Sequence, residues 1–136
     1  MHLPKITITS NDYDRISTLL EDLSPDAQER VQALESELER AVKVPPTQVS
    51  ADVVTMNSRV QYEDEITGTL REVTLVYPTE ADPEAARVSV LSPVGSALLG
   101  MRAGQTIEWP ASRGRRMRFR VLAVPYQPEA AGHFDR

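Results

Sequence analysis

Residues 88–109 read VSVLSPVGSALLGMRAGQTIEW, and this stretch carries its own start and stop signals. Ser92 is suited to cap a helix, because a serine hydroxyl accepts a backbone N–H two or three residues further on. Pro93 fits the first helical position, where its missing N–H costs nothing. Gly100 and Gly104 supply the turns that end such a helix and begin the next strand. The stretch therefore predicts a strand, a short helix and a second strand.

The N-terminal third has the pattern of a short extended segment followed by two helices. Ser10 or Asn11 is expected to cap the first helix, and Ser24 the second. Each helix has apolar residues at spacings of 3, 4 and 3, which is the seam of a coiled coil. The first seam is Tyr13, Ile16, Leu20 and Leu23, and the second is Val31, Leu34, Leu38 and Ala41. Residues 1–46 are therefore predicted to form an antiparallel helical hairpin that ends at two prolines.

From residue 47 onward the pattern changes to that of strands. Expected strand segments are 53–55, 59–63, 70–77 and 115–124, in addition to those of the 88–109 unit. The last segment places Met117, Phe119 and Val121 on one face and arginines on the other. We expect an α+β protein in which the short hairpin of residues 1–46 precedes a domain of residues 47–136. That domain is predicted to be a twisted antiparallel sheet of about five strands holding one short helix.

The composition limits the classes of function. A net charge of −5 disfavours general nucleic-acid binding, which needs a basic surface. The absence of cysteine excludes disulfides and thiolate metal sites. No apolar run is long enough to span a membrane, and the first five residues do not have the pattern of a signal peptide, so a cytoplasmic protein is expected. His2 and His133 lie near the two ends, and no catalytic set accompanies them.

Three segments together resemble a known superfamily. They are residues 92–100 with the following Gly104, residues 52–60 (DVVTMNSRV) and residues 126–132 (YQPEAAG). The first is similar to the C-terminal domain of the GreA/GreB transcript-cleavage factors. All three, with the chain length, are similar to the short-armed branch of that superfamily, the regulators of nucleoside diphosphate kinase. The resemblance implies that the sheet domain has an FKBP-like fold.

The resemblance also implies a docking site for RNA polymerase. The matching positions are Ser92, Pro93, Val94, Gly95, Leu98 and Gly100. Leu91 departs from the pattern, because Gre factors often carry a polar or acidic residue immediately before the Ser-Pro pair. The alternative reading of Ser92 and Pro93 is that they only start a helix.

The hairpin tip is the second candidate site, with Glu21, Asp22 and Asp26 near it. In Gre factors a long coiled coil enters the secondary channel of the polymerase and offers acidic residues to the catalytic metal. Helices of about 12–18 residues extend only about 18–27 Å, which is shorter than the Gre arms. Carboxylates can hold Mg²⁺, but acidic residues beside a Ser-Pro helix start are also explained by capping. We therefore expect no metal and no cofactor.

The arginines between Arg113 and Arg120 form one basic face. This face has two readings, an acidic or nucleic-acid partner or the solvent side of a strand.

The sequence thus predicts a monomeric, non-enzymatic regulator. It would bind RNA polymerase near the secondary channel, compete with Gre-type factors, and change nucleoside diphosphate kinase levels indirectly. Direct binding to the kinase is an alternative. A peptidyl-prolyl isomerase is a third reading, but one Trp, two Phe and four Tyr offer little for an aromatic pocket.

Overall fold

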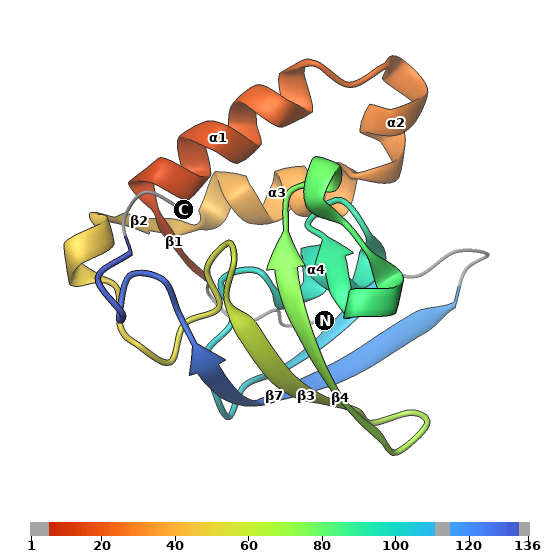
Figure 1. Ribbon diagram of the computed structural model, residues 1–136. Coiled ribbons are helices and arrows are strands. Elements are labelled where there is room, and N and C mark those ends of the chain that lie inside the picture. The colour runs from red at the N-terminus through yellow and green to blue at the C-terminus, as the bar shows by residue number, and fades with distance from the viewer. Residues whose placement is uncertain (1–5, 111–114, 134–136) are drawn as a thin grey trace.

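The computed structural model describes residues 6–110 and 115–133, in which a helical hairpin lies over a twisted sheet (Figure 1). The sheet has five strands in the order β5-β4-β3-β7-β6. Neighbouring strands are antiparallel except β4 and β5, which are parallel. The sheet is therefore mixed, whereas the sequence predicted an antiparallel sheet. The strands are β3 (Arg59–Asp64), β4 (Thr69–Val76), β5 (Arg87–Ser89), β6 (Thr106–Pro110) and β7 (Arg116–Tyr126).

The first helix of the hairpin, α1 (Ser10–Glu21), begins one residue earlier than the capping pattern predicted. Thr9 is the N-cap, and its hydroxyl accepts the Asp12 N–H at 3.1 Å. Thr9 takes this role because it ends β1 (Thr7–Thr9) in extended backbone, which is the conformation an N-cap needs.

The second arm of the hairpin is two short helices, α2 (Pro25–Arg30) and α3 (Gln32–Arg40), not the single helix that the seam predicted. Ser24 caps α2 as expected, with Pro25 at the first helical position. The break falls at Val31, which leaves helical geometry at φ −111° and ψ 17° and donates its N–H to Gln28 O. A β-branched residue is a weak helix former, and the break turns the buried Val31 side chain toward the core.

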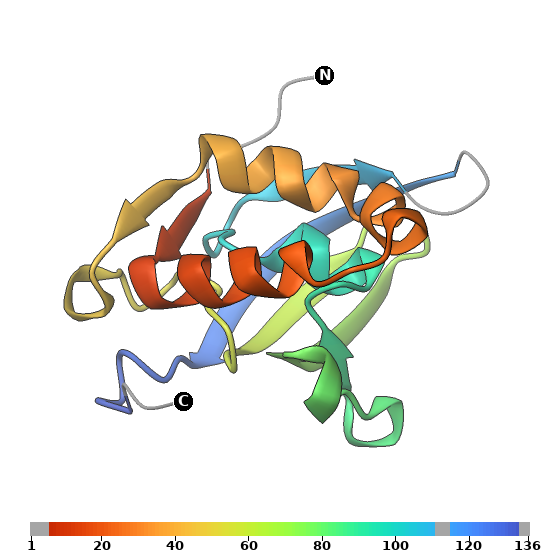
Figure 2. The same ribbon diagram turned by 90° about the horizontal axis from the view of Figure 1, so that it is seen from above.

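The hairpin returns to its starting point through a small parallel sheet. β1 pairs with β2 (Val42–Val44), so Thr7 lies beside Val42 and Thr9 beside Val44. Viewed from above, α1 and α3 run side by side across the sheet, with α4 (Pro93–Leu98) beneath them (Figure 2). The hairpin therefore lies along the body and does not project from it.

One hydrophobic core joins the hairpin to the sheet. Ile16, Leu20, Leu34 and Leu38 of the hairpin belong to the same buried cluster as the inner face of the sheet and α4. The inner face is made by the residues Val60, Tyr62, Val73, Leu75, Ile107, Trp109, Phe119 and Val121. Core contacts thus cross the predicted boundary between residues 46 and 47. Independent folding of the sheet domain stays a prediction.

Short segments complete the chain. Residues 53–55 were expected to form a strand, but only Val53 makes an isolated bridge, to Arg102. Four consecutive residues from Val53 to Met56 are buried, which a strand exposed on alternate sides would not permit. The described part of the chain also has the 3-10 turns η1 (Pro46–Gln48), η2 (Pro78–Glu80) and η3 (Pro83–Ala85). Within the described residues, no helix combines the length and apolar character needed to cross a bilayer.

Candidate docking surface and hairpin tip

The start of α4 has the geometry that its sequence predicted. Ser92 is the N-cap, and its hydroxyl accepts the Gly95 N–H at 3.1 Å while donating to Ser89 O at 2.7 Å. Pro93 occupies the first turn and is exposed, whereas Ser92 and Val94 are half-buried. These three residues are the part of the predicted docking segment that reaches the surface.

The other three predicted docking residues are buried and serve the packing of the segment. Leu98 is fully buried in the core. A Cβ on Gly95 would lie 2.0 Å from Ser89 O, so only glycine lets α4 approach β5 this closely. Gly100 has φ +78°, and a Cβ there would lie 2.7 Å from Cβ of Ile6. Gly95, Leu98 and Gly100 therefore position the surface residues.

A groove of about 620 Å³ is lined by Val94, in the first turn of α4, and by residues of the sheet. Its floor includes Tyr62 and Phe119, whose rings meet edge to face at 5.0 Å between centroids. Val94 contributes one wall, and Asp64 and Arg71 contribute charged groups. The remaining lining residues are Leu70, Glu72, Val73, Pro83, Ala86, Val88 and Met117. The groove therefore combines an apolar floor with a few charged groups.

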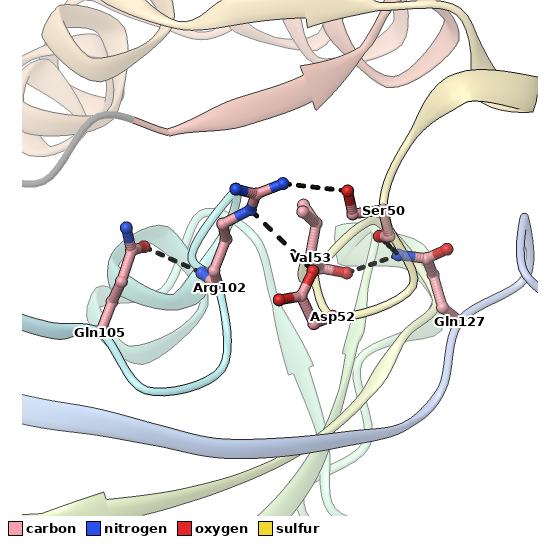
Figure 3. A network of polar contacts seen from close by, with 6 residues as sticks. All are labelled: Ser50, Asp52, Val53, Arg102, Gln105 and Gln127. Carbon is pink, nitrogen blue, oxygen red and sulfur yellow. Dashed lines mark hydrogen bonds and ion pairs between the residues drawn. The ribbon is translucent and has the colours of Figure 1, made fainter.

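Two of the signature segments, residues 52–60 and 126–132, meet the loop after α4 in one polar network (Figure 3). Gln127, after β7, donates its side-chain amide to Ser50 O at 2.7 Å and to Val53 O at 2.8 Å. Arg102, in the loop after α4, donates to the Ser50 hydroxyl at 2.9 Å, and its Nε lies 3.9 Å from Asp52. Such a network holds the α4 loop, the 50–53 segment and the C-terminal segment in fixed relation.

A second polar cluster joins α1 to the body, and the sequence did not predict it. The carboxylate of Asp12 is 3% exposed and accepts the Met56 N–H at 3.1 Å. Thr55 donates its hydroxyl to Glu129 at 2.7 Å. Burial raises the pKa of Asp12 from 3.8 to about 6, with a further increase from the Glu129 charge, while the Met56 N–H opposes the shift. Asp12 looks like an ordinary first-turn acid in the sequence, and only the tertiary fold buries it.

The hairpin tip places its three predicted acidic residues at the surface. Glu21 ends α1, Asp22 is the C-cap, Asp26 lies in the first turn of α2, and all three are exposed. The tip is closed by Gln28, whose side-chain amide donates to Leu20 O and Leu23 O. Within residues 6–110 and 115–133, the acidic and histidine side chains form no group that could hold a metal ion. Asp26 is in the first turn of α2, where an acid is favoured, whereas Glu21 and Asp22 lie at the C-terminal end of α1.

The arginine face lies on the outer side of the sheet, among carboxylates. Arg118 forms an ion pair with Glu65 at 3.3 Å. Arg120 stands directly opposite Glu63 on β3, and Arg118 opposite Glu108 on β6. Arg113 lies outside the described residues. Because these arginines alternate with acidic neighbours, the face is better explained as the solvent side of a strand than as a basic surface for a partner.

Comparisons with known proteins agree with the resemblance seen in the sequence. Residues 48–126 match the family described as transcription elongation factor GreA/GreB, C-terminal, and residues 4–44 match the Rnk N-terminus. The "Regulator of nucleoside diphosphate kinase" of Escherichia coli K12 is 42% identical over 134 residues, 98% of each chain. The "Transcription elongation factor GreA" of Alkaliphilus oremlandii is 38% identical over 81 residues, 60% of this chain and 51% of its own.

A solved structure is similar over nearly the whole fold. The GreA/GreB elongation factor from Nitrosomonas europaea is 44% identical, has a TM-score of 0.70, and is matched over 90% of this chain and 99% of its own. The chain therefore belongs to the GreA/GreB family of transcription elongation factors, and within it to the regulators of nucleoside diphosphate kinase.

Proposed function

We propose that this protein is a non-enzymatic transcription regulator that binds RNA polymerase near the secondary channel and competes there with Gre-type factors. Its effect on nucleoside diphosphate kinase would then follow indirectly, through transcription. The observation that carries the proposal is the match to the GreA/GreB C-terminal family over residues 48–126.

The proposed contact surface is the exposed start of α4 with the groove beside it. Pro93 and Val94 reach the surface here, next to the apolar floor of Tyr62 and Phe119. Two glycines and Leu98 fix this segment against the sheet, so the surface is rigid before a partner arrives. A rigid, largely apolar surface loses little conformational entropy on binding.

The short hairpin supports competition without cleavage. α1 has 12 residues, about 18 Å of helix, and it lies along the body. A carboxylate must lie about 2.0–2.1 Å from Mg²⁺ to act as its ligand. Glu21, Asp22 and Asp26 would therefore stop at the channel opening, where the hairpin excludes a longer factor.

A binding assay with purified RNA polymerase tests the surface. Val94→Glu places a charge on the apolar groove and is expected to weaken binding about tenfold or more. This variant keeps the Ser92 cap, so the helix start is preserved. Leu122→Glu is the matched control, because Leu122 is 41% exposed on β7, away from the groove lining. Equal affinity of a folded Val94→Glu variant and the wild type would refute the assigned surface.

Direct binding to nucleoside diphosphate kinase is the second candidate, favoured by the name of the Escherichia coli relative. Purified kinase is placed in a parallel arm of the same assay. Binding to polymerase and not to kinase supports the transcriptional route. Saturable binding to the kinase alone supports the second candidate instead.

A further inference from the structure

The outer face of the sheet carries a row of four polar side chains across four adjacent strands. Arg59 on β3 is paired with Tyr126 on β7 and with Thr74 on β4, and Thr74 is paired with Arg87 on β5. Paired residues share one face of a sheet, and adjacent strands are about 4.8 Å apart. The backbones of Arg59 and Arg87 are therefore about 10 Å apart, with the Thr74 hydroxyl between them.

This row lines a hollow of about 600 Å³. Val76 forms a buried apolar part of the floor, while Asn57 and Glu80 complete the lining. A hollow of this volume is in the range of small-molecule sites. It is separate from the groove beside α4, and none of its lining residues belongs to the proposed docking surface.

Several lining groups keep hydrogen-bonding capacity for a ligand. Among the described residues, Arg87 forms no ion pair, and the side chains of Asn57 and Thr74 form no hydrogen bond. Arg59 shares its charge with Glu72, at 3.5 Å from Nε to the carboxylate. Guanidinium, hydroxyl and amide groups all donate hydrogen bonds, so the hollow offers mainly donors.

We infer that the hollow binds the phosphate group of a small phosphorylated ligand. Arg59 and Arg87 would supply the charge, because the planar guanidinium matches phosphate oxygens with two parallel hydrogen bonds. Thr74 and Asn57 would supply neutral donors. Glu80 is the one carboxylate in the lining, and Glu72, outside it, is paired with Arg59, so among the described residues Arg87 is the arginine of the lining that no ion pair neutralises. Glu80 would repel an anion, so removal of its charge should strengthen binding.

The inference is tested by amide chemical-shift titration of the full-length, ¹⁵N-labelled protein with inorganic phosphate and with adenosine 5′-monophosphate. Saturable shifts are expected at the amides of Asn57, Arg59, Thr74 and Arg87. Sodium chloride at matched ionic strength is the reference and should not reproduce them. Stronger binding of the nucleotide would show that the rest of the hollow contacts the ester, whereas equal binding would show a site for phosphate alone.

Variants separate this site from general attraction of anions. Arg87→Gln should weaken binding about tenfold, since a hydrogen bond to a charged group is lost. Glu80→Gln should strengthen binding, because a like charge is removed from the lining. Arg120→Gln is the control, because Arg120 is exposed on β7 and lines neither the hollow nor the groove beside α4. Absence of saturable shifts, or equal losses for Arg120→Gln and Arg87→Gln, would overturn the inference.

Discussion

Replacing Asp12 with Asn should make the protein more stable at neutral pH, although the side chain is buried and hydrogen-bonded. Asp12 is 3% exposed, its carboxylate accepts the Met56 N–H, and Glu129 is a negatively charged neighbour. An asparagine keeps an oxygen for Met56 and removes the buried charge. The other titratable groups beside Asp12 are Arg15 and the phenol of Tyr77. Burial raises the pKa of Tyr77.

The magnitude follows from the pKa of Asp12, which is raised to about 6 in the native protein from an ordinary value of 3.8. The native state therefore holds the proton more tightly than the unfolded chain, so this carboxyl favours folding as pH falls. Linkage gives about 1.4 kcal/mol of added stability between about pH 7.5 and pH 5, and about 2.4 kcal/mol by pH 4. The charge costs up to about 3 kcal/mol near neutral pH, and Asp12→Asn removes that cost.

The assay is urea unfolding of the wild type and Asp12→Asn at several pH values, followed by circular dichroism. The excess stability of Asp12→Asn at about pH 7.5 should shrink by about 1.4 kcal/mol at pH 5. Asp14→Asn, an exposed change two residues further along the same helix, is the control for loss of a negative charge near the helix N-terminus. A stability difference between wild type and Asp12→Asn that does not change with pH would refute the reasoning.

Two further predictions concern packing. Gly95→Ala should destabilise the protein by about 1–3 kcal/mol or more, because its Cβ would lie 2.0 Å from Ser89 O, and thermal unfolding measures the loss. Residues 47–136 alone should still form the sheet but unfold at a lower temperature, since Ile16, Leu20, Leu34 and Leu38 no longer cover the core. An unfolded fragment under conditions where the full chain is folded would show that the hairpin and sheet form one folding unit.

Local signals in the sequence predicted several elements of the fold. Ser92 and Pro93 start α4, and Gly100 and Gly104 take positive φ, because caps and left-handed turns depend on a few adjacent residues. The alternation along β7 likewise predicted that Phe119 and Val121 are buried. These features need no knowledge of distant contacts.

Features that depend on distant segments were not predicted. The break at Val31 interrupts an apolar seam that was regular in sequence, and residues 53–55 are buried on all sides instead of joining the sheet. The parallel pairing of β1 with β2 joins segments more than thirty residues apart. One sequence alone does not specify which residues of two strands are paired. Tertiary packing decides such contacts.

Only the part of the candidate site that depends on a local motif was predicted from the sequence. Ser92, Pro93 and Val94 were found from a local motif, and the structure places them at the surface. Gly95, Leu98 and Gly100 belong to that motif, but burial gives them a packing role. The groove beside Val94 and the Arg59–Thr74–Arg87 row depend on strand order, which no local pattern in the sequence specified.

The most direct test of the proposed function is a stalled elongation complex of RNA polymerase, challenged with this protein in the presence and absence of a Gre factor. The protein alone should release no 3′ RNA fragments, because in the proposed mode of binding Glu21, Asp22 and Asp26 would stop short of the catalytic metal. Excess protein should suppress cleavage by the Gre factor in proportion to its occupancy, and Val94→Glu should restore cleavage. Release of 3′ fragments by the protein alone, abolished by Asp26→Asn, would contradict the account, as would Gre-dependent cleavage that stays unchanged at saturating protein.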